Sequence, residues 1–141
     1  MPSARSFNVF GEPIEVLVSG DVTGGLSTTL TQSSPPGGGP PPHSHRYEDE
    51  TFFVLKGEYE FLHDGQWTRR AAGGTWHASR GTVHTFRNVG DTVGTMLVFV
   101  APSGMDKYLE EISTLSMPDD TARLVIISEQ YGIAFPDLRP A

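Results

Sequence analysis

The chain has 141 residues, with 10 Lys and Arg, 17 Asp and Glu, and a net charge of −7 at pH 7 when histidine is neutral. A chain of this length can bury about two thirds of its unfolded surface, so one domain is expected. It contains no cysteine, which excludes disulfide scaffolds, thiolate zinc sites, cysteine nucleophiles and cysteine-bound iron–sulfur clusters. Because the basic residues form no cluster, nucleic acid is not an expected partner.

The apolar stretches are short, and the longest cover residues 96–101 and 124–127. A membrane span needs about 18 apolar residues, so no membrane segment is expected. The first ten residues carry neither a basic leader nor an apolar run of the signal-peptide kind. We therefore expect a soluble, cytoplasmic protein.

Short apolar runs separated by turn residues make up the first hundred residues. Glycine (16) and proline (11) are frequent and stand between these runs, as is usual for turns. Many short strands at regular spacing are typical of a β-sandwich or β-barrel, so we expect an all-β fold. The predicted strands cover residues 14–19, 26–32, 51–56, 58–63, 82–87 and 95–101.

The pattern changes after residue 102. Ser103 to Asp106 forms a capping-box pattern, and the apolar residues that follow have helical spacing, which predicts a helix over 105–116. A second helix is predicted from Asp119 as N-cap to Gly132, although residues 125–127 have strand-like propensity. We therefore expect a β-barrel over 1–102, followed over 103–141 by a helical extension of the same domain, with two α-helices outside the barrel.

A proline- and glycine-rich segment, 35–42, precedes His43 and His45. Its composition would fit a linker, but because it is short we interpret it as a stiff approach to a site. The two histidines stand two positions apart, so on one strand their imidazoles project from the same face. Glu50 reaches that face if the chain turns at residues 46–49, and His84 comes from a later strand.

Three neutral imidazoles and one carboxylate form a site for a divalent transition metal, with positions left for water or substrate. We expect His43, His45, Glu50 and His84 to bind one metal ion per chain. Imidazole and carboxylate suit Mn, Fe, Ni, Zn and Cu alike, so the sequence leaves the identity of the metal open.

Several polar residues near this pattern have two interpretations. Glu48 or Asp49 would replace Glu50 as the ligand if the turn before it were shorter. His77 either supports the site from behind or lies on the surface. Arg80 either binds a substrate carboxylate at the mouth of the pocket or is solvated.

His63 lies in a hairpin turn signal and is expected to be solvated. The aromatic residues of this region either line a cavity or fill the barrel interior and its outer layer. They are Tyr47, Phe52, Trp76 and Phe86.

Two spaced patterns resemble the motifs of the cupin superfamily. The first, G-x5-H-x-H-x3–4-E-x6-G, is matched at Gly37, His43, His45, Glu50 and Gly57. The second, G-x5-P-x-G-x2-H-x3-N, is matched at Gly73, Gly81, His84 and Asn88, with Ser79 in the place of the proline. That difference concerns the stiffness of the turn before His84 and not its role as a ligand. The resemblance implies a cupin (jelly-roll) β-barrel of short antiparallel strands. It also implies that a metal ion is held by the two histidines and the glutamate of the first motif and by the histidine of the second.

Two weaker patterns, Asp21 to Gly25 and Pro102 to Gly104, narrow the resemblance to small single-domain cupins similar to quercetin dioxygenase. This resemblance implies a dioxygenase-type oxidoreductase that acts on a small aromatic or enolic molecule, with Glu50 as ligand and as catalytic base. Two other classes stay open. One is a non-redox isomerase or lyase that uses the metal as a Lewis acid, and the other is a cupin that binds a metal or small molecule without catalysis.

A homodimer is expected because a small open-ended barrel has sheet edges that need covering. The apolar strand near residues 7–10 could add to a neighbour's sheet, and the resemblance implies the same. The expected partners are therefore a small-molecule substrate and a second copy of the chain.

Overall fold

The computed structural model describes residues 5–138. All strand pairings in this part of the chain are antiparallel, and the expected all-β fold with two helices near the C-terminus is confirmed. The elements follow in the order β1 (Arg5–Val9), β2 (Glu12–Val18), β3 (Thr28–Ser34), β4 (Ser44–His45), β5 (Asp49–Lys56), β6 (Glu58–His63), β7 (Gln66–Ala71), β8 (Thr75–Ala78), β9 (His84–Asn88), β10 (Gly94–Ala101), α1 (Met105–Ile112), α2 (Thr121–Gln130) and β11 (Ile133–Ala134).

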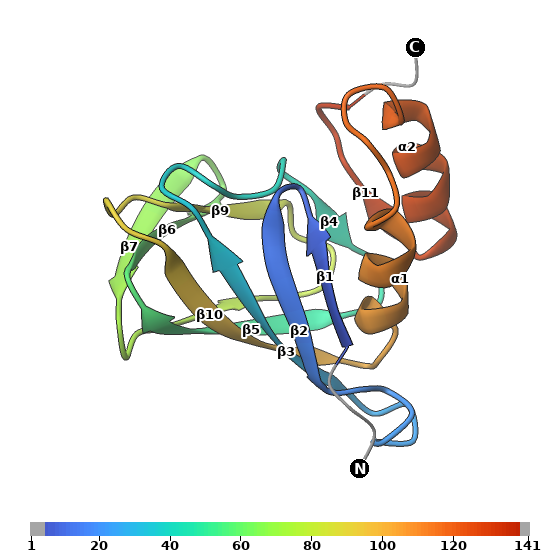
Figure 1. The fold of residues 1–141 in the computed structure, drawn as a ribbon, viewed down its shortest axis with the longest axis horizontal. Coiled ribbons are helices and arrows are strands. Elements are labelled where there is room, and N and C mark those ends of the chain that lie inside the picture. Colours follow the sequence, from blue (N-terminus) through green and yellow to red (C-terminus); the bar gives the residue numbers. More distant parts are fainter. Residues whose placement is uncertain (1–4, 139–141) are drawn as a thin grey trace.

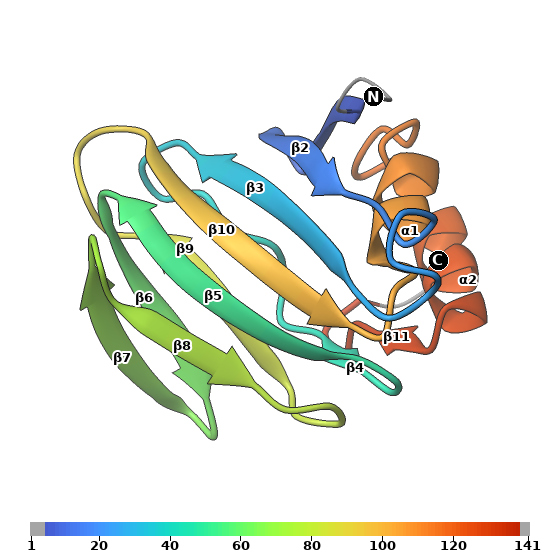
Figure 2. The ribbon, with the colours of Figure 1, turned by 90° about the horizontal axis from the view of Figure 1, so that it is seen from below.

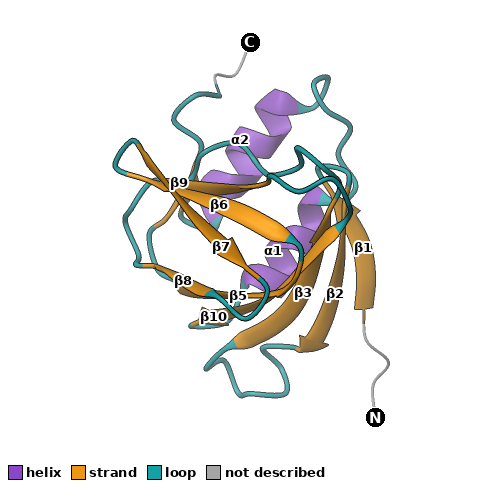
Figure 3. Cartoon of the chain, turned by 90° about the vertical axis from the view of Figure 1, so that its left-hand side faces the viewer, coloured by secondary structure: helices purple, strands orange, loops and turns teal. Residues whose placement is uncertain are grey.

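Two sheets form the walls of the barrel. The larger sheet has the strand order β1-β2-β3-β10-β5-β8, and the smaller has the order β7-β6-β9. Figure 2 shows the long strands of the larger sheet side by side, and Figure 3 shows both sheets from the end of the barrel. Both helices lie at one end of the barrel (Figure 1). A two-stranded ladder between β4 and β11 ties the C-terminal segment to that end.

Alternate residues of the strands point into the barrel, because successive side chains of a strand face opposite sides. On β5 the predicted inward residues Glu50, Phe52 and Val54 are all buried, whereas Phe53 and Leu55, which follow Phe52 and Val54, are exposed. The same alternation runs along β10. A single apolar core therefore fills the space between the two sheets and reaches the helices.

The proline- and glycine-rich segment runs along β9. Gly37 N donates a hydrogen bond to Asn88 O at 2.9 Å. A Cβ atom at Gly39 would lie 1.9 Å from the carbonyl oxygen of Phe86, so only glycine permits this close approach. The segment is therefore fixed against the barrel and leads directly to His43, as a stiff approach to a site requires.

Most ends of the predicted strands differ from the observed ends by one or two residues, and the others agree. β7 and β8 lie outside the predicted strands. β7 carries two arginines and pairs only with β6, so it lacks the apolar run by which a strand is usually detected. β8 has four residues, which is too short for a clear alternation.

The capping box predicted at Ser103 is wrong. The N-cap of α1 is Gly104, and no side chain caps this helix. Asp106 is fully buried instead, where it accepts hydrogen bonds from Arg5 Nη2 at 2.7 Å and from Thr28 Oγ1 at 3.2 Å. This carboxylate therefore joins α1 to β1 and β3, and the helix ends at residue 112 rather than 116.

The N-cap of α2 is Asp120 rather than Asp119, and its carboxylate accepts a hydrogen bond from Ser116 N at 2.8 Å instead of capping the helix. Residues 125–127 belong to α2 despite their strand-like propensity. Gly132 follows the helix with a φ of 74°, the left-handed conformation that commonly ends helices. Neither described helix is long and apolar enough to cross a membrane.

Candidate metal centre

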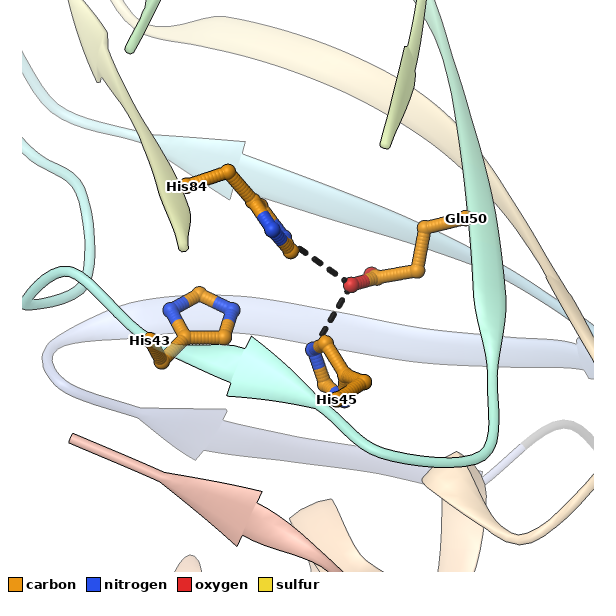
Figure 4. Close-up of side chains that lie close together, drawn as sticks. All are labelled: His43, His45, Glu50 and His84. Atoms are coloured by element: carbon orange, nitrogen blue, oxygen red, sulfur yellow. Dashed lines mark hydrogen bonds and ion pairs between the residues drawn. The ribbon is translucent and has the colours of Figure 1, made fainter. Parts of the chain in front are cut away.

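The four predicted ligands meet at the end of the barrel that faces the helices (Figure 4). His43 precedes β4, His45 is on β4, Glu50 is on β5 and His84 begins β9. One ligand atom from each residue lies within 4.8 Å of the others. Ligands bound at about 2.1 Å on opposite sides of one ion are about 4.2 Å apart. Small side-chain shifts would therefore bring all four groups around a single ion.

Backbone carbonyls orient two of the imidazoles. His43 Nδ1 lies 2.9 Å from Pro41 O, and His84 Nδ1 lies 3.1 Å from Thr82 O. Because a carbonyl oxygen only accepts hydrogen bonds, each Nδ1 carries the proton and donates it. In the neutral ring the lone pair is then on Nε2, which is the arrangement found in metal-binding histidines.

The carboxylate of Glu50 lies between two imidazoles. Its Oε1 is 2.7 Å from His45 Nε2 and 3.2 Å from His84 Nε2. The His45 contact is close but lacks hydrogen-bond geometry, and both ring nitrogens of this buried residue have no hydrogen-bond partner. Two electron-pair donors at such distances repel each other unless a proton or a cation is shared between them. The buried and partly unpartnered donor set therefore fits a divalent transition metal.

The electrostatics of the cluster reflect this crowding. Burial and the neighbouring His45 and His84 lower the pKa of His43 to about 3. Burial also opposes the charge on His45, but the Glu50 and Glu48 carboxylates outweigh it and raise the pKa of His45 to about 9. Burial would raise the pKa of Glu50, yet the two nearby imidazoles hold it well below its usual range. Because the pKa of His45 is raised, a metal ion that binds here must displace the proton of this imidazole.

Neither neighbouring acid takes the place of Glu50. Glu48 is buried, with Oε1 3.8 Å from His45 Nδ1, so it supports the far side of that imidazole. Its position three residues after a ligand histidine is the only sequence signal of this role. Asp49 binds the Arg80 guanidinium, with Nη2 and Oδ2 2.9 Å apart, and this contact lowers the pKa of Asp49 to about 2.

Arg80 does not line the cavity, and the same ion pair occupies its guanidinium, so the structure gives no support to the alternative that it binds a substrate carboxylate. Arg80 N also donates to Asp49 Oδ1 at 2.8 Å, and Gly81 N donates to His45 O at 2.7 Å. These hydrogen bonds hold the turn that carries Ser79 in place of proline. The approach to His84 is therefore fixed without the proline ring.

The remaining histidines lie outside the cluster. His77 is on the outer face of β8, where its Nδ1 is 3.0 Å from Thr51 Oγ1, so it does not support the site from behind. His63 is partly exposed beside Asp64, with its ring 6.3 Å from that of Trp76. Both positions agree with the surface interpretation of these residues.

A cavity of about 60 Å³ opens from the cluster. Phe52 and Phe86 line it, whereas Tyr47 is exposed and Trp76 stacks on Phe61 with 5.0 Å between ring centroids. Part of the wall was not predicted from the sequence and comes from β1, α1 and the C-terminal segment. These lining residues are Val9, Phe10, Met105, Tyr108, Leu109, Ile112, Ile133 and Phe135.

Comparison with known proteins agrees with this architecture. The cupin domain family matches residues 30–100, which is 71 of the 141 residues. KdgF from Halomonas sp. superposes with a TM-score of 0.65 and 17% identity over 73% of this chain and 90% of that chain. A predicted oxalate decarboxylase from Thermotoga maritima superposes with a TM-score of 0.62 and 24% identity over 71% of this chain and 92% of that chain.

A sugar phosphate isomerase of the cupin superfamily from Silicibacter pomeroyi superposes with a TM-score of 0.59 and 22% identity, over 70% of each chain. At this level of identity these likenesses concern the fold alone. No curated protein matches the sequence. The domain match covers half of the chain, and the strand order, the two spaced motifs and the neighbouring structures agree with it, so the chain belongs to the cupin domain family.

Proposed function

We propose that the protein is a metal-dependent oxidoreductase of dioxygenase type that acts on a small enolic or aromatic molecule. The observation that supports this most is the position of the His–Glu cluster at the end of an apolar cavity. His43, His45, Glu50 and His84 would hold one divalent ion there. When bound, such an ion would supply open coordination positions and redox or Lewis-acid chemistry.

The charge of the cavity wall favours this substrate class. The charged side chains among the described lining residues belong to the cluster itself, and no lysine or arginine is among them. Oxalate or a phosphorylated sugar would bring a second negative charge beside the metal ion, and no lysine or arginine of the described cavity wall could pair with it, which makes its burial costly. An enol or phenol needs to lose only one proton at the metal and can place its apolar part against Phe52 and Phe86.

The protein's own residues can carry out two parts of such a reaction. Glu50 can accept the hydroxyl proton of the substrate on a carboxylate oxygen, which leaves the substrate as an enolate or phenolate. The apolar wall keeps bulk water away from the resulting anion. Gln32, an inward residue of β3 that lines the cavity, offers an uncharged hydrogen-bonding group to the bound molecule.

Oxygen uptake tests this proposal. The protein would be loaded with Fe(II), Mn(II), Ni(II) or Cu(II) and mixed with small enols, catechols and flavonols. We expect uptake with at least one metal form. Glu50→Gln should retain much of the metal and lose turnover by about 100-fold or more, the scale of a lost general base. Glu15→Gln, an exposed change on β2, is the matched control.

Each outcome has a clear meaning. No uptake by any metal form would overturn the dioxygenase proposal and favour a non-redox isomerase, a lyase or a binding protein. Unchanged turnover in Glu50→Gln would remove Glu50 as the base. A small molecule that is carried through purification and not consumed would favour the binding class.

We also propose a homodimer. β1 is an edge strand of the larger sheet, and an unpaired edge can add to the sheet of a neighbour. The outer face of the same sheet also exposes Phe53, Leu55 and Phe99. Light scattering at tens of micromolar should give twice the mass of the chain, and a monomer at that concentration would contradict the proposal.

A further inference from the structure

The cover of the metal cavity comes from segments outside the part of the chain that matches the cupin domain family. That match ends at residue 100, whereas α1 and the C-terminal segment follow it. Figure 1 shows α1, α2 and β11 together at this end of the barrel. The barrel therefore supplies the His–Glu cluster, and the added segments determine how much space lies beside it.

Phe135 is the residue of this cover whose ring lies beside a proposed metal ligand. Its ring centroid lies 5.6 Å from that of His43, and it meets the ring of Phe10 edge-on at 6.2 Å. The residue lines the cavity and is only 9% exposed. Its ring is thus in direct contact range of one proposed metal ligand.

The backbone next to Phe135 is held in place. Ile133 pairs with His45, and Ala134 pairs with Ser44, in the ladder between β11 and β4. Arg46 N adds a hydrogen bond of 2.8 Å to the carbonyl of Gly132. Because β4 also carries a proposed ligand, the distance between Phe135 and the cluster is set by the same ladder.

The space that remains is small. The cavity measures about 60 Å³, whereas an engineered cavity that binds benzene in another protein measures about 150 Å³. One aromatic ring therefore does not fit beside the cluster while the Phe135 ring is in place. Replacing Phe135 with alanine removes the ring and would open space of the benzene-binding size.

We infer that Phe135 is the specificity-determining residue of this site, and that its ring limits the ligand to a compact, apolar molecule with one metal-binding oxygen function. This inference rests on the proposed function for the metal-binding group of the ligand. Within the proposed substrate class it favours small aliphatic enols and excludes the aromatic members, from phenols and catechols to flavonols.

The first test needs no metal. Wild-type protein and Phe135→Ala would be treated with a chelator and melted with and without benzene. We expect benzene to raise the melting temperature of Phe135→Ala by about 2 °C or more, through binding to the folded state, and to leave the wild type unchanged. Leu17→Ala, an exposed change on β2, is the matched control.

An equal rise in the melting temperature of the wild type on adding benzene would overturn the inference. So would a folded Phe135→Ala whose melting temperature does not rise with benzene. If Phe135→Ala does not fold, Phe135→Leu provides the same comparison with a smaller loss of side chain. A benzene effect in Phe135→Leu that does not exceed that of the wild type would equally overturn it.

The second test uses the Co(II)-loaded protein and its visible absorption spectrum. Azide is a small probe of the metal and 4-nitrocatechol is a large one. Phe135→Ala should tighten 4-nitrocatechol binding by about tenfold or more and leave azide binding nearly unchanged. Equal changes for both probes would overturn the inference. Failure to bind Co(II) would count against the proposed function, while the benzene test would still decide the role of Phe135.

Discussion

Two glutamates are buried inside this barrel, and their environments are opposite. Glu50 lies among the imidazoles, which hold its pKa well below the usual range. Glu12 lies next to Ser34, and burial raises its pKa to about 7, against the weaker effects of hydrogen bonds from Ser34 and Gln32. Thr28 lies in the same layer of the barrel as Glu50, because both pair with Val100. Ser34, the neighbour of Glu12, is six residues further along β3, or roughly 20 Å of strand.

The difference shows what a buried carboxylate needs in order to stay charged. Both glutamates are almost completely removed from solvent, so burial disfavours the charged form of each. The neighbouring imidazoles of His45 and His84 compensate for this at the Glu50 end. At the Glu12 end the neighbours are neutral, and Glu12 Oε2 and the Tyr59 hydroxyl have no hydrogen-bond partner among the described residues. One end is therefore suited to a metal ion, and the other is suited to a protonated acid.

The largest expected effect is the loss of metal from the Glu50 end. His45→Ala and His84→Ala should each reduce the metal content from about one ion per chain to near zero, because each removes a proposed ligand. Elemental analysis after reconstitution gives the measurement. Circular dichroism should show that both variants stay folded, since the apolar core holds the strands.

His63→Ala is the control, since its side chain lies outside the cluster. Metal loss in this variant as complete as in His84→Ala would show that the ligands are assigned wrongly. Glu12→Gln should also keep its metal, because the two ends are chemically separate.

A smaller effect is expected at Glu12, where the substitution should increase the stability of the protein. The folded-state pKa lies above the ordinary value of 4.5, so this group favours the folded state most below about pH 4.5, and the advantage is lost as pH rises through about 7. Glu12→Gln should therefore stabilise the protein by roughly 3 kcal/mol at about pH 8 and by little at about pH 4.5. Denaturant unfolding of variant and wild type at both values measures the difference.

Glu50→Gln sharpens the contrast. In chelator-treated protein it should be destabilising, because it removes the carboxylate partner of His45. The same sign of effect for Glu12→Gln and Glu50→Gln at about pH 8 would contradict the comparison between the two ends.

The smallest expected effect is the pH dependence of stabilisation by metal. Each histidine must be neutral to bind the ion, and the pKa of His45 is raised to about 9, so protons compete with the ion for this ligand increasingly as the pH falls below that value. The gain in melting temperature on adding metal should therefore be larger at about pH 7.5 than at about pH 5.5. Comparing metal-loaded with chelator-treated protein removes the contribution of Glu12, which is common to both. An equal gain at both pH values would show that the histidines are not the ligands.

Local patterns in the sequence predicted the barrel and the composition of the cluster. The spacing of His43 and His45 puts both rings on one face of a strand, and the turn before Glu50 brings the carboxylate to them, so few long-range contacts are needed to foresee the group. The helix caps could not be predicted in the same way, although the first helix begins at residue 105 as predicted. Asp106 belongs to the predicted capping box, but its carboxylate accepts hydrogen bonds from Arg5 and Thr28 instead. Asp119 is the predicted N-cap of the second helix, whereas the structure has Asp120 at that position, with its carboxylate bound to Ser116 N.

The sequence by itself determined which groups can bind a metal, because residue type and short-range spacing depend only on neighbours along the chain. Only the tertiary structure decided what surrounds them. Phe135 lies 92 positions after His43 in the sequence, and no periodicity links the two, yet the ladder between β4 and β11 places their rings in contact range. The opposite fates of Glu12 and Glu50 have the same origin, since the pKa of a buried carboxylate depends on charges that folding brings near it.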